Sequence, residues 1–344
     1  MAHRNFDRNH QGIKLMPRVT VILTTYNRLN YLKKAINSVL NQTFKNFDLI
    51  ILDNASPDGT DEYVKSLRDE RIIYIRNPEN IGAMNNGLKA FDLIRNNIKS
   101  QFVSFFHDDD MMKPNLLESE IKIFKSHQDV VLVATNIELM DENEKIIQKK
   151  GLRRISHDII IEKYKYIEGF LKRKYAIYLP TVMIRRSFLS ANDFRPRPEI
   201  GPAADTFLWF EMNLLPNKFY LINEPLLRYR IHNNQDSQIN CLEMKLPFFK
   251  GSLDLFRKND LYNLYRFLKK YAASDLINTL SSQRFLKSID NKKALKKYIE
   301  VMKKDHSFAE ISNVKINILL FISLYIPNIF RLIYLLRRKL MRFL

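Results

Sequence analysis

The sequence predicts an α/β fold with a mostly parallel sheet and flanking helices, followed by a helical C-terminal region. Short runs of Val, Ile, Leu and Phe alternate with amphipathic stretches between Arg18 and Leu139, which is typical of a sheet that helices cover on both faces. The 344 residues are 46% hydrophobic and 27% charged, as in packed globular chains. From about Cys241 turn signals become rare, and helices rich in Leu, Phe, Tyr and Lys are expected.

The expected elements before residue 141 are strands and helices in alternation. Continuous apolar runs predict strands at 19–23, 47–53, 72–75, 101–106 and 130–135. Apolar residues at helical spacing predict helices at 29–40, from the turn at 56–59 through residue 67, at 82–98 and at 114–127.

The later part of the chain is expected to be less regular. A charged segment at 141–157 precedes a helix near 159–174, a strand near 177–184, a helix near 203–215 and a strand pair at 219–223 and 226–231. We expect a leader at 1–17, a sheet domain at 18–240, a helical region at 241–310 and a terminal helix at 311–344. The leader is polar and has no apolar core, so we expect it to be disordered rather than a signal peptide, and the protein not to be secreted.

Polar residues gather where the expected strands end. They are Thr24–Asn27, Asp53 with Asn54, Asn77–Gly82 and His107–Asp110, after the first, second, third and fourth strands. Ligands bind at the carboxyl ends of parallel strands, so these clusters predict one binding crevice. Turns also need polar residues, which is the alternative for each cluster taken alone.

Three consecutive aspartates, Asp108, Asp109 and Asp110, end the fourth strand. Adjacent carboxylates repel one another, and a divalent cation with oxygen ligands relieves the repulsion. Alternate residues of an extended segment point the same way, so we expect Asp108 and Asp110 to share the metal while Asp109 turns aside. The alternative is that Asp109 or Asp110 caps the helix that starts near Pro114.

Composition narrows the classes of protein. Only 8 glycines argue against a Gly-rich phosphate loop, and the single cysteine, Cys241, can form no intramolecular disulfide and fits no zinc spacing. The reducing cytoplasm is therefore the expected compartment. The net charge of +19 favours anionic partners such as phosphorylated metabolites, acidic lipid or nucleic acid.

Six segments in order resemble motifs of the family 2 glycosyltransferases, which have the GT-A fold. They are VTVILTTYNR (19–28), DLIILDNASPDGT (48–60), NPENIGAMNNG (77–87), FFHDDDMMKP (105–114), PAADTFLWFEMNLL (202–215) and INEPLLRYRIHNNQDS (222–237). The resemblance implies a metal-dependent, inverting transfer of a sugar from a nucleoside-diphosphate sugar, with a UDP-sugar favoured, to a hydroxyl of a glycan or lipid-linked acceptor. Bacterial cell-surface polysaccharide assembly is the expected setting.

The sequence departs from the family pattern at four positions. Thr24 replaces a proline, Asn54 replaces a second acidic residue, and Met84 stands where an arginine is common. His107 stands where many relatives carry the first acid of the DxD motif. Which two of the three aspartates form the metal pair therefore stays open.

The resemblance implies donor-binding roles for Thr25, Tyr26, Asn27, Asp53, Asn80, Gly82, Asp108 and Asp109. Asp53 would accept hydrogen bonds from the base or the ribose, as a carboxylate can only accept. The alternative for Asp53 is a turn residue that is folded onto the backbone.

Catalytic and metal-binding roles follow from the same resemblance. It implies Mn²⁺ or Mg²⁺ held by Asp108, Asp110 and His232, and Asp205 as the base that takes the acceptor's proton. The alternatives are a helix cap for Asp205 and a solvated histidine for His232.

Several basic residues have expected roles beside the site. We expect Arg228 and Arg230 to position the last motif, and Thr181 with the pair Arg185 and Arg186 to border the acceptor site.

The last thirty residues are the most apolar part of the chain. Arg331, Arg337, Arg338, Lys339 and Arg342 lie among Ile, Leu, Phe and Tyr with no acid, which suits an amphipathic helix on an anionic membrane surface. We therefore expect a cytoplasmic protein, peripheral at the inner face of the cell membrane. The alternative is a core helix that packs on the catalytic domain or on a second copy, as a homo-oligomer.

Other functions fit the sequence less well. A sugar nucleotidyltransferase would need a Gly-rich basic loop after the first strand, and TTYNR lacks one. A basic nucleic-acid-binding protein would explain the charge, but no nucleic-acid-binding signature is present, so we expect no nucleic-acid partner. A relative that binds without catalysis is disfavoured by the retained aspartates Asp53, Asp108, Asp110 and Asp205.

Overall fold

The computed structural model describes residues 18–152, 154–232, 235 and 242–280, in two compact units. Among these residues the first unit holds those up to Pro196 together with Leu208–His232, and the second holds Arg197–Phe207 and those beyond His232. The expected leader at 1–17, Cys241 and the terminal helix at 311–344 lie outside the described residues.

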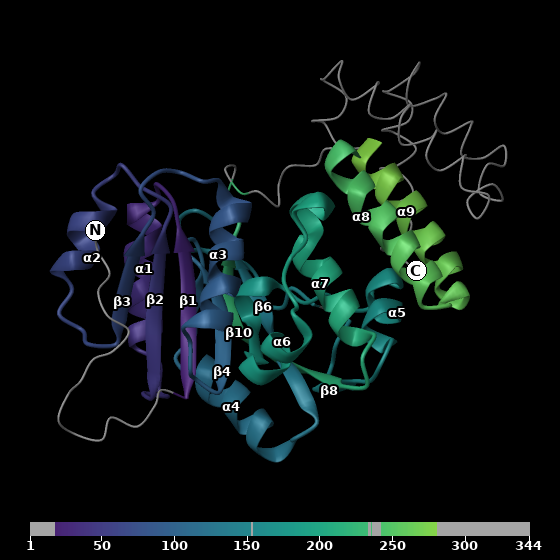
Figure 1. The fold of residues 1–344 in the computed structure, drawn as a ribbon, viewed down its shortest axis with the longest axis horizontal. Helices are drawn as coiled ribbons and strands as arrows, with labels where there is room; N and C mark the ends of the chain where they lie inside the picture. The colour runs from purple at the N-terminus through teal and green to yellow at the C-terminus, as the bar shows by residue number, and fades with distance from the viewer. Residues whose placement is uncertain (1–17, 153, 233–234, 236–241, 281–344) are drawn as a thin grey trace. The chain divides into compact units, whose positions relative to one another are not determined.

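The described part of the first unit is built on one ten-stranded sheet in the order β3-β2-β1-β4-β9-β6-β10-β5, with β7 and β8 beside β6 and β10 (Figure 1). Six strands run in the same direction: β1 (Val19–Thr25), β2 (Phe47–Asp53), β3 (Ile72–Arg76), β4 (Phe102–His107), β6 (Val130–Met140) and β10 (Lys218–Arg230). The antiparallel strands are β5 (Met111–Met112), β7 (Ile146–Gln148), β8 (Ile159–Ile161) and β9 (Val182–Arg185). The expected mostly parallel α/β sheet is confirmed.

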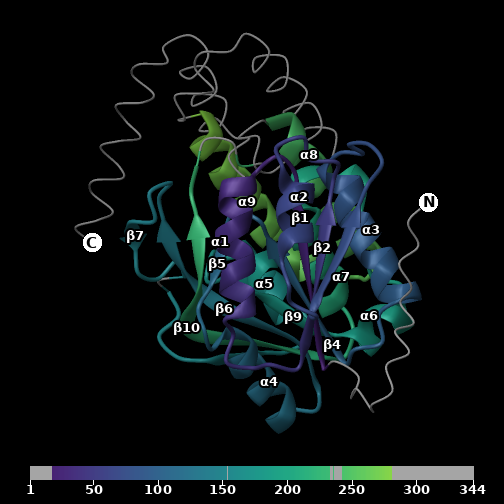
Figure 2. The ribbon, with the colours of Figure 1, turned by 90° about the vertical axis from the view of Figure 1, so that its left-hand side faces the viewer.

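Helices cover both faces of this sheet, and α1 and α3 flank β1 and β2 in Figure 2. The helices of this unit are α1 (Leu29–Leu40), α2 (Thr60–Ser66), α3 (Ala83–Asn96), α4 (Leu116–Ser126), α5 (Lys165–Leu171), α6 (Arg186–Asn192) and, from Leu208 on, α7 (Ala204–Asn213), with a 3₁₀ turn η1 (Leu179–Thr181). Alternate residues of a strand face opposite sides. Phe106 accordingly joins the core cluster that contains the α1 residues, whereas Phe105 stacks on Phe91 of α3 at 4.8 Å between ring centroids.

Two element predictions are wrong. The segment 159–174 is not one helix, because the β-branched run Ile159–Ile161 pairs with β10 as a strand and the helix starts only at Lys165. The expected strand pair at 219–223 and 226–231 is the single strand β10, which stays parallel to β6 through register shifts around Pro225. Proline interrupts the ladder there without reversing the chain.

The described part of the second unit is helical. It holds the 3₁₀ segment η2 (Pro198–Ala203), α8 (Leu242–Lys258) and α9 (Tyr262–Leu280). Gly251 lies on α8 where a Cβ atom would meet Ile200 Cδ1 at 2.5 Å, so a residue without a side chain lets η2 pack closely on α8. No helix among the described residues is long and apolar enough to cross a membrane.

Candidate active site

The carboxyl ends of four neighbouring strands bring the expected polar clusters to one edge of the sheet. Thr25 at the end of β1 lies beside Asp53 at the end of β2, and Asp53 lies beside Arg76 at the end of β3. On the other side of β1, Thr24 lies beside His107 at the end of β4. The sequence predicts this convergence because each polar cluster follows a strand that is expected to be parallel to the others.

Asp108 is buried and turned toward the end of β1. Its Oδ2 accepts hydrogen bonds from Thr25 Oγ1 at 2.8 Å and from the backbone N–H of Tyr26 at 3.3 Å. Its Oδ1 contacts Arg28 Nη1 at 3.2 Å. Burial and the charge of Asp109 raise the pKa of Asp108, against the opposing effects of Arg28 and Thr25. Protein groups therefore engage both of its oxygens.

Asp109 lies between an arginine and a histidine. Its Oδ2 is 3.0 Å from Arg28 Nη1 and 3.0 Å from His232 Nε2. The backbone oxygen of Asp109 accepts a hydrogen bond from Arg230 Nε at 2.8 Å. The end of β10 thus meets the end of β4, and His232, which the sequence expects near the metal, contacts the second aspartate of the triplet.

Asp110 carries a buried oxygen that has no partner in the described structure. Its Oδ1 accepts a hydrogen bond from the backbone N–H of Arg230 at 2.9 Å, whereas its Oδ2 is buried and unpaired. Burial, followed by the charge of Asp109, raises the pKa of Asp110 well above its ordinary value. A buried oxygen without a partner is destabilising unless a ligand or ion contacts it, so this atom is a candidate ligand atom.

A candidate set of metal ligands is present within the described residues. His107, Asp109 and Asp110 each offer one ligand atom, and these three atoms lie within 4.8 Å of one another. Two carboxylates and an imidazole, with the unpaired oxygen of Asp110 among them, fit a divalent cation. Of the expected ligands Asp108, Asp110 and His232, only Asp110 belongs to this set, and His107 joins it instead.

The helix that follows the aspartates is not capped by them. Helix α4 begins at Leu116 with Asn115 as its N-cap residue, and no side chain makes the capping hydrogen bond. The alternative that Asp109 or Asp110 serves as a cap is therefore wrong.

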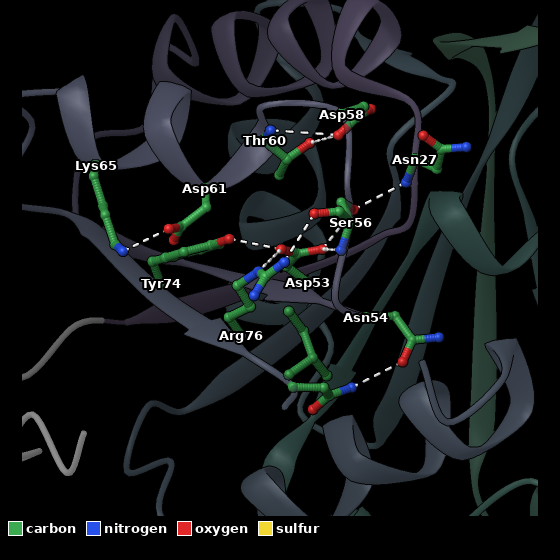
Figure 3. A network of polar contacts seen from close by, with 12 residues as sticks. Asn27, Asp53, Asn54, Ser56, Asp58, Thr60, Asp61, Lys65, Tyr74 and Arg76 are labelled. Atoms are coloured by element: carbon green, nitrogen blue, oxygen red, sulfur yellow. Dashed lines mark hydrogen bonds and ion pairs between the residues drawn. The ribbon is translucent and has the colours of Figure 1, made fainter. Parts of the chain in front are cut away.

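Asp53 is fully buried and saturated with hydrogen bonds from the protein (Figure 3). Its Oδ1 accepts from the backbone N–H of Ser56 at 2.9 Å and from Ser56 Oγ at 2.6 Å. Its Oδ2 accepts from Tyr74 Oη at 2.6 Å and from Arg76 Nε at 3.2 Å. Burial and the hydrogen bond to Asp53 raise the pKa of Tyr74. The carboxylate thus holds the turn and Arg76, as in the alternative that the sequence leaves open for Asp53.

A network of asparagine side chains holds the loop after β3. Asn54 Nδ2 donates to Asn80 Oδ1 at 2.7 Å, and Asn54 Oδ1 accepts from Asn77 Nδ2 and from the backbone N–H of Ile81, each at 3.0 Å. Asn80 Oδ1 also accepts from the backbone N–H of Gly82 at 2.9 Å. The Asn54 amide therefore both donates and accepts, which an ionised carboxylate at this position could not do.

The turn after β1 and the loop after β3 both use left-handed backbone. Asn27 has φ +53° and its backbone N–H donates to Ser56 Oγ at 2.9 Å. Gly82 has φ +81° at the start of α3, a conformation that glycine adopts without strain. Tyr26, the residue before Asn27, is 41% exposed, so a ligand at this edge can reach it.

Two arginines organise the aspartates. Arg28, at the N-cap position of α1, contacts both Asp108 and Asp109, yet the sequence suggests no role for it beyond its place in the TTYNR motif. Arg230 is 0% exposed and its Nη1 donates to the backbone oxygen of Glu142 at 3.2 Å, with its guanidinium 4.6 Å from the ring centroid of Tyr31. The predicted positioning role of Arg230 agrees with these contacts.

Asp205 and Arg185 make other contacts. Asp205, in the first turn of α7, belongs to the second unit and accepts a hydrogen bond from the backbone N–H of Thr206 at 2.6 Å. Arg185 pairs with Phe102 at the amino end of β4 and donates to the backbone oxygen of Val130 at 2.7 Å. The expectation that Thr181, Arg185 and Arg186 border the acceptor site stays a prediction.

Residues 20–190 match the family model described as glycosyl transferase family 2. The chain belongs to that family. A family 2 relative, an uncharacterized glycosyltransferase of Methanocaldococcus jannaschii, is 28% identical over 236 residues, which are 67% of this chain and 76% of the relative. The family assignment predicted from the six motifs is confirmed, and this glycosyltransferase is an enzyme with the GT-A fold.

Solved glycosyltransferases share the fold. S. aureus TarS (residues 1–349, in complex with UDP-GlcNAc) superposes with a TM-score of 0.63 at 17% identity, covering 82% of this chain and 81% of that chain. The mannosyltransferase PcManGT of Pyrobaculum calidifontis, in complex with GDP-Man and Mn²⁺, superposes with a TM-score of 0.52 at 13% identity, covering 91% and 88%. At 17% and 13% identity, these superpositions show the fold of this chain and nothing more.

Proposed function

We propose that this glycosyltransferase moves a sugar from a nucleoside-diphosphate sugar to a hydroxyl of a glycan or lipid-linked acceptor, with inversion at the anomeric carbon. The observation that carries the proposal is the edge of the sheet where β1 to β4 end, because it joins the exposed ring of Tyr26 to three buried aspartates. The flat ring of Tyr26 could stack on the base of the donor. The carboxylates could hold a cation that binds its diphosphate. The UDP and GDP donors in the TarS and PcManGT complexes support this donor class.

His107, Asp109 and Asp110 would hold a divalent cation, Mn²⁺ or Mg²⁺. The unpaired buried Oδ2 of Asp110 supports this set. When bound, the cation would neutralise charge on the departing diphosphate. Asp108 would keep the β1 turn in place through Thr25 and the N–H of Tyr26, next to the donor.

Asp205 would take the proton from the attacking acceptor hydroxyl. Its place in the motif PAADTFLWFEMNLL supports this role, as does its position in the first turn of α7. A carboxylate that removes this proton makes the acceptor oxygen a better nucleophile. Attack from the face opposite the diphosphate inverts the configuration of the sugar.

The first test is a screen of UDP-sugars and GDP-sugars for thermal stabilisation and for hydrolysis, with Mn²⁺, with Mg²⁺ and with a chelator. We expect at least one donor to raise Tm in the presence of a metal and to be hydrolysed slowly. The proposal fails if no nucleotide-sugar changes Tm under any of these conditions.

The second test separates the base from the donor site. Asp205→Asn should lower transfer about 10²-fold or more, since a positioned base contributes about 10²–10⁴-fold, while stabilisation by the nucleotide-sugar stays as in the wild type. Exposed Glu142→Gln is the matched control with the same loss of charge. An Asp205→Asn enzyme with full transfer activity would exclude Asp205 as the base.

The expected cellular setting also belongs to the proposal. The basic and apolar composition of residues 315–344 supports a cytoplasmic enzyme that is peripheral at the inner face of the membrane, where lipid-linked acceptors are found.

A further inference from the structure

Arg28 contacts two of the three aspartates. Its Nη1 lies 3.2 Å from Asp108 Oδ1 and 3.0 Å from Asp109 Oδ2, and the side chain is 28% exposed. The two aspartate side chains are only 5% and 7% exposed. A partly exposed guanidinium therefore reaches from the start of α1 onto carboxylates that are otherwise cut off from water.

The other cations near the triplet serve different partners. Arg230 directs its side chain to backbone oxygens of Asp109, Asp141 and Glu142. Lys113 forms an ion pair with Glu138 at 2.8 Å. The side chain of Arg28 bridges Asp108 and Asp109, two aspartates of the triplet. Since adjacent buried carboxylates repel one another, its charge stabilises the cluster when no metal is bound.

Arg28 and the candidate metal set share Asp109. A divalent cation bound by His107, Asp109 and Asp110 would bring two positive charges close to a guanidinium that lies 3.0 Å from an oxygen of Asp109. Like charges this close repel, and in a buried site the repulsion is only weakly screened. The arginine and the cation therefore compete for the same carboxylate.

We propose that Arg28 is an internal counter-ion that weakens the binding of a divalent cation until an anionic donor arrives. This inference rests on the proposed function, since the donor diphosphate is the anion that would draw the guanidinium away from Asp108 and Asp109. The metal and the donor then bind with positive coupling, and by thermodynamic reciprocity each increases the affinity for the other.

The test measures Mn²⁺ binding directly, by electron paramagnetic resonance of free Mn²⁺, on the full chain without nucleotide. Arg28→Gln should bind Mn²⁺ about tenfold more tightly than the wild type, because the competing charge is gone. Arg28→Lys, which keeps a charge but cannot bridge both carboxylates as a planar fork does, should fall between the two. Arg95→Gln removes an exposed arginine that pairs with Asp193, and it should leave Mn²⁺ binding unchanged.

Adding UDP or GDP measures the coupling. Nucleotide should increase the Mn²⁺ affinity of the wild type by a larger factor than that of Arg28→Gln. Equal or weaker Mn²⁺ binding by Arg28→Gln would overturn the inference while leaving the proposed function in place. If Arg28→Gln does not fold, Arg28→Lys takes its place in the test. Wild-type Mn²⁺ affinity in Arg28→Lys would then overturn the inference. No Mn²⁺ binding by any of these proteins, with or without nucleotide, would overturn both the inference and the metal site of the proposed function.

Discussion

Two carboxyl groups of this protein, those of Asp110 and Glu120, are buried with oxygen atoms that accept no hydrogen bond in the described structure. Asp110 keeps one unpaired oxygen beside the charge of Asp109, and Glu120 on α4 is fully buried with neither carboxyl oxygen hydrogen-bonded in the described structure. Burial raises the pKa of both groups well above their ordinary values. The two residues differ in surroundings, because Asp110 has ligand-type neighbours and Glu120 lies among the apolar residues of α4.

Asp110→Asn should separate metal binding from stability. The amide oxygen can still accept from the backbone N–H of Arg230, but the negative charge is lost, so we expect Mn²⁺ affinity and transfer to fall about 10²-fold or more. Without metal, Tm should rise because a buried repulsion is removed. Isothermal titration with Mn²⁺ and thermal denaturation check the two effects. Glu142→Gln serves as the control, and unchanged Mn²⁺ binding by Asp110→Asn would exclude it as a ligand.

Glu120 should make stability depend on pH. Its pKa in the folded protein lies above the ordinary 4.5, so the folded state binds more protons than the unfolded state between the two values. The free energy of unfolding therefore falls as pH rises from about 4.5 through the folded pKa. Glu120→Gln should remove this pH dependence and should be more stable than the wild type at pH 8. Its Tm should rise by about 2–4 °C for each kcal/mol gained in the free energy of unfolding. Parallel Tm–pH curves for the two proteins would contradict the expectation.

At the scale of elements, strand ends and their loops build the site together. Strand β2 ends in Asp53, which fixes the following turn, and Asn54, which fixes the loop after β3. Strand β4 delivers the aspartates, and β10 returns Arg230 and His232 to them from more than a hundred residues later. The loops are held by side-chain amides and hydroxyls rather than by packing alone.

Asn54→Asp should loosen the loop after β3. A carboxylate cannot donate to Asn80 Oδ1, which lies 2.7 Å from Asn54 Nδ2, so the two oxygens would repel. We expect the free energy of unfolding to fall by about 1–3 kcal/mol. We also expect KM for the donor to rise by a larger factor than kcat changes. Donor kinetics and Tm check this, with Asn41→Asp on the exposed end of α1 as the matched control. Wild-type KM and Tm in Asn54→Asp would show that the amide network is dispensable.

At the scale of the whole molecule, the net charge of +19 and the basic apolar segment at 315–344 favour an anionic surface as a partner. That segment lies outside the described residues, so its role stays a prediction from sequence. If this segment instead packs on the protein or on a second copy, its basic residues should not affect binding to anionic vesicles.

The triple substitution Arg337→Gln, Arg338→Gln and Lys339→Gln should weaken binding to vesicles that contain anionic lipid. Each basic residue near such a surface contributes about 1 kcal/mol, so we expect a loss of about two orders of magnitude in partition coefficient, measured by co-sedimentation. Neutral vesicles give the baseline for both proteins. Equal binding of the variant and the wild type to anionic vesicles would favour a helix that packs within the protein.

The mostly parallel sheet and the edge where the site forms could be predicted from the amino-acid sequence. Continuous apolar runs separated by helical periodicity allow little but a parallel sheet, and parallel strands place their following loops at one edge. Asp53, Asn80 and Asp108 to Asp110 could therefore be assigned to one site without coordinates. The corrections fall where short β-branched runs or a proline in a strand gave ambiguous local signals, as at Ile159–Ile161 and Pro225.

The contacts between individual atoms depend on the tertiary structure. Asp53 is saturated by Ser56, Tyr74 and Arg76, and Arg28 bridges Asp108 and Asp109, whose positions in sequence are about eighty residues away. His107 joins Asp109 and Asp110 because β4 ends at His107 and the chain turns at Asp108 and Asp109, so the alternation of an extended strand does not continue through the aspartates. Local sequence patterns predict the secondary structure of a segment. Hydrogen bonds and ion pairs between distant segments depend on side-chain directions that are fixed only when the sheet and its helices pack together.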